Sequence, residues 1–224
     1  MIPVYFLYSD EKDAQLNWFK CQRQASHSVA FKSVGTIFES HKAIADDCTA
    51  DRFYVVDGDN YILDNFTFNK QIELKPKSVA VFRSKNPVNG LVYGHGGIKL
   101  FSKDCFSAER LDKPDMTTTL ADSYIKVNIL ASEHRFNYSP YSTWRTAFRE
   151  AVKLSAGINK NNNDDESLAR LQMWLNAGNE AEYGYFSIQG ARAGERYSKR
   201  SNADLTKVND FRWLEQQFKD WCGV

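Results

Sequence analysis

The sequence predicts an α/β fold whose mixed, mostly parallel sheet is flanked by helices and followed by a helical C-terminal region. Short apolar runs alternate with amphipathic stretches in residues 1–60, an order typical of parallel strands joined by right-handed helical crossovers. Later apolar runs are separated only by turn residues, so some of those strands should pair antiparallel. The last third of the chain carries apolar residues at helical spacing.

Strands are predicted at 3–8, 28–34 and 52–56, because each is a short run of apolar, aromatic or β-branched residues. Helices are predicted between them, at about 12–25 and 36–48. In the first of these helices Leu16, Phe19 and Cys21 are the residues expected to face the core.

Further strands are predicted at 78–84, 97–101 and 124–130, with Gly94-His95-Gly96-Gly97 as turn material. Two segments are predicted to be polar loops, 157–165 and 189–203. Three apolar stripes predict helices in the last third: Trp144, Ala147, Phe148, Ala151 and Val152; Leu168, Leu171, Trp174 and Leu175; and Phe211, Leu214, Phe218 and Trp221.

Composition limits the class of protein. The chain has 224 residues, of which 42% are hydrophobic and 14% aromatic, enough for a substantial core. A charged content of 25% excludes a disordered chain, and a net charge of +1 argues against a uniformly basic nucleic-acid binder. Residues 1–142 are expected to form an α/β core and 143–224 a helical region packed on it, as one compact domain.

The cysteines Cys21, Cys48, Cys105 and Cys222 are far apart and contain no CxxC pair. This argues against a zinc ribbon, a redox motif and a disulfide framework, and favours reduced thiols. The first residues lack the basic start and cleavage site of a signal peptide, and no apolar stretch reaches the ~20 residues that span a bilayer. The expectation is a soluble, cytoplasmic protein that does not engage a membrane.

The sharpest chemical feature is Asp57-Gly58-Asp59, directly after the third strand. Two carboxylates in this arrangement suit a hard divalent cation, and ligands of open α/β sheets bind beyond the carboxyl ends of the strands. An exposed acidic turn is the alternative. An EF-hand is excluded, because its pattern requires other residues where Tyr61, Ile62 and Phe68 stand.

Other candidates each have a structural alternative. Gly94-His95-Gly96-Gly97 is neither a P-loop nor a Rossmann motif, and is either a close approach to substrate or an ordinary turn. Asp115 and Asp122 are candidate bases or solvated acids, and His134 is a candidate metal ligand or a structural histidine.

Basic residues occur in two groups. Arg145, Arg149 and Lys153 recur every four residues and could bind phosphate oxygens, or form a solvated helix face. The segment 189–207 carries four clustered cations that suit a phosphate-contacting surface, a lid over a donor, or a merely soluble loop. They are Arg192, Arg196, Lys199 and Arg200.

The run from Gly35 through Asn60 resembles the donor-binding half of GT-A-fold glycosyltransferases, in which a helix and a strand lead to a DxD metal motif. The segments VVDGDN, GHGGIKLF and FNYSPYSTWRTAFREAVKL together resemble small glycosyltransferases of T-even-like bacteriophages. Some of those enzymes attach glucose or arabinose to hydroxymethylcytosine in phage DNA. The broad resemblance covers roughly residues 3–155.

The resemblance implies roles for individual residues. Asp57 and Asp59 would bind Mn²⁺ or Mg²⁺ and the donor diphosphate, with His134 as a further metal ligand. Ser9 and Asp10 would contact the nucleoside, and Gly96 and Gly97 would form a loop on the acceptor side. Asp115, chosen over Asp122, would act as the base. Independently of the resemblance, Arg145 and Arg149 are candidates to bind the donor diphosphate or a DNA backbone.

These observations predict a metal-dependent glycosyltransferase that moves a sugar from a UDP-linked donor to a hydroxyl. The expected acceptor is 5-hydroxymethylcytosine in double-stranded phage DNA, in the cytoplasm of the host. One alternative is a sugar nucleotidyltransferase, although Ser9-Asp10-Glu11-Lys12 lacks the glycines such enzymes carry after the first strand. The other is a non-catalytic nucleic-acid-binding protein.

Overall fold

The computed structural model describes residues 1–107, 113–158 and 164–223. These residues form two compact units. Of the described residues, the first unit contains 1–86, 92–107 and 116–135, and the second contains 87–91, 113–115, 136–158 and 164–223. The boundary predicted at 142/143 falls within a helix of the second unit.

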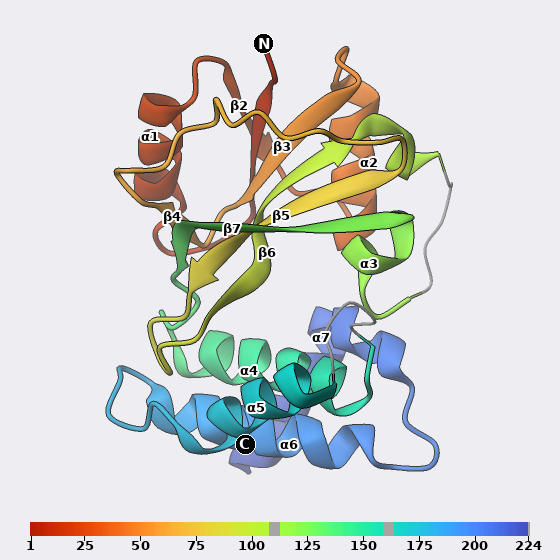
Figure 1. The fold of residues 1–224 in the computed structure, drawn as a ribbon. Helices are drawn as coiled ribbons and strands as arrows, with labels where there is room; N and C mark the ends of the chain where they lie inside the picture. The colour runs from red at the N-terminus through yellow and green to blue at the C-terminus, as the bar shows by residue number, and fades with distance from the viewer. Residues whose placement is uncertain (108–112, 159–163, 224) are drawn as a thin grey trace. The chain divides into compact units, whose positions relative to one another are not determined.

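The predicted β-α-β-α-β order is confirmed in the first unit (Figure 1). Strands β1 (Val4–Tyr8), β2 (Ser28–Lys32) and β3 (Arg52–Asp57) are parallel, with β1 between the other two. Helices α1 (Ala14–Gln24) and α2 (Ile37–Asp47) form the two crossovers.

The remaining strands extend this sheet to seven strands in the order β2-β1-β3-β6-β5-β7-β4. They are β4 (Asn60–Ile62), β5 (Ser78–Lys85), β6 (Val92–Ser102) and β7 (Ser123–His134). The short helices η1 (Lys103–Phe106) and α3 (Met116–Leu120) lie between β6 and β7. Within the described residues, three neighbouring pairs are parallel and three antiparallel. The α/β class with a mixed sheet is therefore confirmed, with a smaller parallel share than the sequence suggested.

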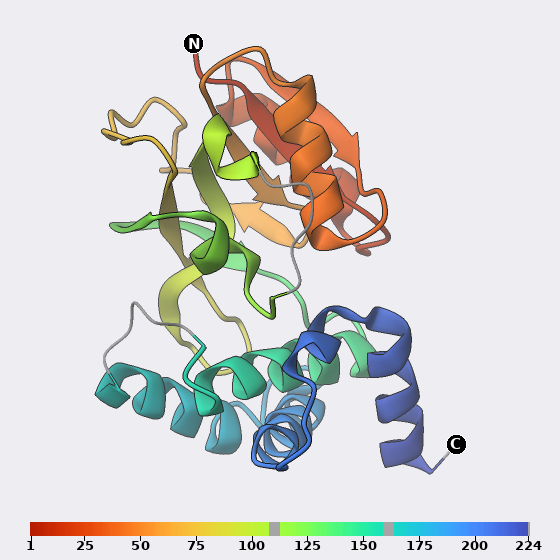
Figure 2. The same cartoon turned by 90° about the vertical axis from the view of Figure 1, so that its right-hand side faces the viewer.

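Helices α1 and α2 cover opposite faces of the sheet, and Figure 2 shows α2, in orange, lying along one of them. Alternate residues of a strand point to opposite faces. Val4 and Phe6 accordingly join the cluster that includes Cys21 of α1, while Tyr5 joins the cluster that includes Phe38 of α2.

The face that α1 turns toward the sheet differs from the predicted one. Leu16 and Phe19 are 52% and 58% exposed, so the prediction that they are buried is wrong. The buried residues of α1 are Asn17 and Cys21, with Trp18 partly buried beside them. The polar Asn17 occupies the inward position because its side chain binds the backbone of the acidic turn.

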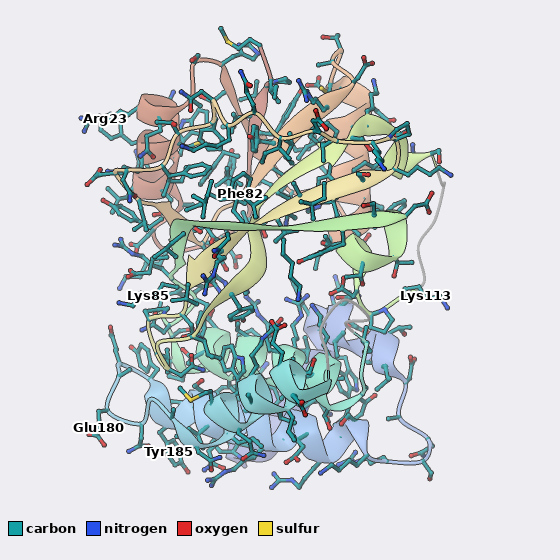
Figure 3. The ribbon with its side chains drawn as sticks, viewed as in Figure 1. Arg23, Phe82, Lys85, Lys113, Glu180 and Tyr185 are labelled. Carbon is teal, nitrogen blue, oxygen red and sulfur yellow. The ribbon has the colours of Figure 1, made fainter. Side chains whose placement is uncertain are left out.

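Aromatic side chains fill the interior of the first unit. Phe82 of β5 is 1% exposed, and its ring centroid lies 6.0 Å from that of Tyr54 and 5.2 Å from that of Phe66. Figure 3 shows Phe82 among the strands, whereas Arg23 on α1 points away from them. The sheet is therefore a rigid base for residues at its edges.

The second unit is helical, as predicted. Its elements are α4 (Pro140–Ser155), α5 (Asp164–Asn176), α6 (Gly184–Ser198), η2 (Leu205–Asn209) and α7 (Phe211–Cys222). Helices α4, α5 and α7 confirm the three helices predicted from apolar stripes, although two members of the stripes, Leu168 of α5 and Phe211 of α7, are 56% and 42% exposed. None of the helices that the structure describes is long and apolar enough to cross a membrane.

The prediction of a loop at 189–203 is wrong for its first ten residues, which belong to α6. The segment is polar because one side of α6 faces solvent, while its glycines face α4 and allow close packing. A Cβ at Gly190 would lie 2.3 Å from the carbonyl oxygen of Trp144, and one at Gly194 would lie 2.3 Å from that of Phe148. Glycine at this four-residue spacing lets α6 approach α4 backbone to backbone. Of the other predicted loop, 157–165, residues 159–163 lie outside the described residues, and α5 already begins at Asp164.

Candidate active site

The acidic turn Asp57-Gly58-Asp59 begins at the last residue of β3 and leads into β4. Asn17 of α1 is fully buried, and its Nδ2 donates a hydrogen bond to the Gly58 carbonyl oxygen at 2.8 Å. A Cβ at Gly58 would lie 2.7 Å from Oε2 of Glu11 and 3.1 Å from Cα of Tyr8. A side chain here would displace the Glu11 carboxylate and crowd the backbone of Tyr8, so glycine lets the segment after β1 pack directly on the turn.

Ser9 and Asp10 lie at the same edge of the sheet as the acidic turn, since Leu7 pairs with Asp57 in the parallel register of β1 and β3. Both residues are exposed. The backbone N–H of Ser9 donates to Glu11 Oε2 at 2.7 Å, and burial raises the pKa of Glu11. The structure thus brings Ser9 and Asp10 to the candidate site, where their contact with a nucleoside stays a prediction.

Asp57 forms an ion pair with Lys99 of β6. The Lys99 Nζ lies 2.9 Å from both carboxylate oxygens of Asp57, and the side chains are 5% and 33% exposed respectively. Burial raises the pKa of Asp57 and the neighbouring Asp59 adds to this, while the Lys99 ammonium opposes both. Lys99 was not among the predicted site residues, although a lysine inside the apolar run GIKLF was a visible signal of a buried partner.

Asp59 is paired with His134, the last residue of β7. Their Oδ2 and Nε2 atoms are 2.9 Å apart, because the antiparallel register of β4 and β7 places Asn60 opposite His134. The His134 ring also lies against the ring of His95, with centroids 3.7 Å apart and planes inclined by 33°. Two residues that were predicted to bind one metal ion, 75 positions apart in the chain, are thus neighbours.

A buried polar network supports Asp59. Asn60 is fully buried; its Nδ2 donates to Asp59 Oδ1 at 2.9 Å, and its Oδ1 accepts from Ser132 Oγ at 2.9 Å. The Ser132 hydroxyl is also 3.0 Å from the hydroxyl of Ser84 on β5. No sequence pattern indicates this network, because its members come from three different strands.

The predicted turn at Gly94-His95-Gly96-Gly97 is wrong, since all four residues belong to β6. A Cβ at Gly97 would lie 2.1 Å from Asn60 Oδ1, so this glycine makes room for the Asn60 side chain. Gly96 has a φ of +88°, which favours glycine, close to a register shift in the pairing of β6 with β5. The role of Gly96 and Gly97 toward an acceptor stays a prediction.

Asp115, Arg145 and Arg149 belong to the second unit. The Asp115 carboxylate is 3.5 Å from Lys153 Nζ. The Arg149 Nε donates to the Val208 carbonyl at 2.7 Å, and the Arg145 guanidinium lies 4.7 Å from the ring centre of Phe211. These contacts give both arginines a structural role in joining α4 to the following elements, and phosphate binding by them stays a prediction. Asp122 is exposed, and its backbone N–H donates to Lys77.

The four predicted nucleic-acid contacts are all exposed. Arg192 and Arg196 are one helical turn apart on α6, and Lys199 and Arg200 follow directly after its last residue. Lys199 forms an exposed ion pair with Glu195 at 2.8 Å, and the Arg200 guanidinium lies over the Tyr197 ring. The end of α6 and the two residues after it therefore present a short basic stripe to solvent, made of Arg192, Arg196, Lys199 and Arg200.

The fit to a metal ion is partial. Among the described residues there is no group of three or more His, Cys, Asp or Glu that could hold one. Asp59 and His134 provide two converging ligand atoms, whereas both oxygens of Asp57 accept from Lys99. Mg²⁺-type cations commonly take one or two protein carboxylates and complete their shell with phosphate oxygens and water. Asp59 and His134 therefore offer two of the ligand atoms that the predicted metal ion requires, and metal binding stays a prediction.

A cavity of about 450 Å³ lies in the first unit away from these residues. It is lined at the start of β3, β5 and β7 by Arg52, Ser78 and Ser123, together with Glu73 and Lys75. These strands run in the same direction, so the cavity is at the opposite edge of the sheet from the acidic turn. None of the predicted site residues contributes to it.

No family profile matches this sequence, and no curated protein is detectably similar to it. Two solved structures are similar to part of the chain. One is a glycosyltransferase involved in the glycosylation of the major capsid of PBCV-1, at 13% identity and a TM-score of 0.39, covering 57% of this chain and 82% of that one. The other is HddC from Yersinia pseudotuberculosis, at 14% identity and a TM-score of 0.35, covering 58% and 70%. Likeness at this level does not establish a shared activity.

Proposed function

We propose that this protein is a glycosyltransferase that moves a sugar from a nucleotide-sugar donor, UDP-linked, to a hydroxyl group. The observation that carries the proposal is the meeting of Asp57, Asp59 and His134 beside Ser9 and Asp10 at one edge of the sheet. Open α/β sheets bind ligands at this edge. The exposed Ser9-Asp10 segment would accept the nucleoside, and the acidic turn would face the diphosphate.

The leaving group of such a reaction is a nucleoside diphosphate, whose negative charge must be stabilised as the sugar departs. A divalent cation, Mn²⁺ or Mg²⁺, would supply that stabilisation when bound with the donor. In this proposal Asp59 and His134 hold the cation, and Asn60 fixes the Asp59 carboxylate through its hydrogen bond. A side chain that hydrogen-bonds to a metal-binding residue orients that residue and raises the affinity for the metal.

The acceptor hydroxyl must lose a proton as the new bond forms. We assign this role to Asp115, whose carboxylate lies 3.5 Å from Lys153 Nζ. The proposed acceptor is 5-hydroxymethylcytosine in double-stranded DNA. The exposed stripe of Arg192, Arg196, Lys199 and Arg200 supports a polyanionic acceptor, and a base modified within a duplex must be extruded to reach a pocket.

Donor screening tests the proposal directly. The protein is incubated with Mn²⁺ and a panel of UDP- and GDP-sugars, with and without hydroxymethylcytosine DNA, while nucleotide release and nucleoside mass are followed. We expect one UDP-sugar to be consumed and the nucleoside mass to rise by one sugar. Asp59→Asn should lower the rate by about 100-fold or more, whereas the control Asp51→Asn, an exposed acid at the start of β3, should not. Absence of turnover with every donor would reject the proposed glycosyltransferase activity.

A second candidate, a non-catalytic nucleic-acid-binding protein, is favoured by the basic stripe of α6 alone. This candidate predicts salt-sensitive DNA binding whose affinity does not depend on the acidic turn. The double variant Asp57→Asn/Asp59→Asn separates the two functions, because it should abolish sugar transfer while leaving DNA binding intact. A sugar nucleotidyltransferase would instead be inactive in this screen and would release pyrophosphate when given a nucleoside triphosphate and a sugar 1-phosphate, which a parallel incubation supplies.

A further inference from the structure

Lys99 is a buried cation fixed against one half of the acidic turn. It lies on β6 opposite Val55, so its side chain is on the same face of the sheet as Asp57, two residues further along β3. Its Nζ donates to both oxygens of Asp57, each at 2.9 Å, and the side chain is only 5% exposed. A buried ammonium without a counter-charge would be strongly unfavourable, so loss of either partner of the pair would be costly.

The two acids of the turn consequently differ. Asp57 directs its carboxylate to Lys99, whereas Asp59 directs its own to His134 and Asn60. The Asp57–Lys99 pair carries no net charge, which leaves Asp59 as the acid of the turn that is paired with a potential metal ligand.

We propose that Lys99 is a positioning residue that keeps Asp57 from binding a divalent cation. The turn then binds a cation weakly by itself, through Asp59 and His134, and firmly only when a nucleoside diphosphate supplies further oxygen ligands. The inference rests on the proposed function for the identity of that diphosphate. The main test of the role of Lys99 requires neither donor nor turnover, so this inference and the proposed function can fail separately.

The test is Mn²⁺ binding by the full chain without nucleotide, followed by electron paramagnetic resonance of the free ion and by calorimetry. Lys99→Met keeps the length of the buried side chain and removes its charge, which frees the Asp57 carboxylate beside Asp59. We expect the variant to bind Mn²⁺ at least about tenfold more tightly than the native protein, a change of about 1.4 kcal/mol.

Lys103→Met is the matched control. Lys103 also lies in the first unit, but its Nζ donates to the Cys48 carbonyl and not to a carboxylate, so its loss should leave Mn²⁺ affinity unchanged. A folded Lys99→Met variant with native or weaker Mn²⁺ affinity would overturn the proposal.

Asp57→Asn provides a second, independent test in case Lys99→Met does not fold. The asparagine can still accept a hydrogen bond from Lys99. With Mn²⁺ and UDP present, we expect Asp57→Asn to retain native cation affinity, and Asp59→Asn and His134→Ala to lose it. Equal losses for Asp57→Asn and Asp59→Asn would show that both acids bind the cation and would overturn the proposal.

Discussion

The side chain of Asn60 lies directly against Gly97 beside the acidic turn. Asn60 is fully buried and binds Asp59 and Ser132, so its side chain has no room to withdraw. The absence of a side chain at Gly97 is what allows this arrangement. One missing methyl group on β6 therefore determines the orientation of a carboxylate on the neighbouring turn.

Gly97→Ala should destabilise the protein by about 2–3 kcal/mol, because the added Cβ overlaps Asn60 and overpacked sites relax poorly. Urea unfolding measures the change. Gly94→Ala is the control on the same strand, since its Cβ would be 3.5 Å from the Tyr124 hydroxyl, an ordinary contact. Equal stability of the two variants would contradict the packing of Asn60 against Gly97.

His41 of α2 is a buried neutral histidine. Its Nδ1 is 2.8 Å from the Ile37 carbonyl oxygen, and its ring stacks on Phe106. Burial, with a smaller contribution from Lys99, lowers the pKa of His41 from 6.5 to about 3. In the unfolded chain His41 is therefore protonated below about pH 6.5, whereas in the folded protein it stays neutral until the pH falls to about 3.

Stability should accordingly fall as the pH drops below about 6.5, with His41 contributing a loss of about 2 kcal/mol between about pH 7 and pH 5. His41→Gln removes the titrating group and should flatten this part of the profile, measured by urea unfolding at each pH. His27→Gln, at an exposed position, should leave the profile unchanged. A native slope in His41→Gln would show that other groups cause the acid sensitivity.

At the scale of elements, α6 and α4 pack through glycine. Gly190 and Gly194 lie one turn apart on α6, against the backbone of Trp144 and Phe148. Helix propensity alone disfavours both glycines by about 1 kcal/mol each relative to alanine. Close contact with α4 outweighs this cost, since the two backbones touch along a full turn.

For Gly194→Ala, close packing and helix propensity predict opposite signs of the change in the free energy of unfolding. Gly194→Ala should lower the free energy of unfolding by about 2 kcal/mol through overpacking, although it improves helix propensity. Arg192→Gly, on the exposed side of the same helix, should cost about 0.8–1 kcal/mol by propensity alone. Thermal and urea unfolding check both values, and stabilisation by Gly194→Ala would disprove the close packing.

For the whole molecule, positive and negative charges nearly cancel to a net +1. A polyanion can therefore be attracted only by a local cluster, and the basic stripe at the end of α6 is such a cluster. Binding there should be sensitive to salt in proportion to the number of phosphates bound.

We expect Arg192→Ala/Arg196→Ala to lower the slope of log K against log salt for duplex DNA by about two, at ~0.9 for each phosphate that is no longer neutralised. Fluorescence anisotropy over a salt series measures the slope. Arg23→Ala/Lys32→Ala, which removes two exposed cations of the first unit, should leave it unchanged. An equal reduction in both double variants would indicate diffuse attraction without a defined surface.

Much of the fold could be predicted because it depends on local periodicity. The first three strands, their two helices and the stripes of α4, α5 and α7 all follow from the spacing of apolar residues. Two predictions fail where glycines pack closely: the turn at 94–97, predicted from its glycines, and the loop at 189–203, predicted from its polarity. A glycine chosen for close packing and a glycine chosen for a turn look the same in a sequence, and only the neighbour distinguishes them.

The sequence by itself determined the α/β class, the order of the first five elements and the position of Asp57 and Asp59 at the end of a core strand. Tertiary structure alone decided which partner each acid has: Lys99, 42 positions away, for Asp57 and His134, 75 positions away, for Asp59. The physical reason is that hydrophobic periodicity is local along the chain, whereas buried charges are compensated by whichever group strand register places opposite them.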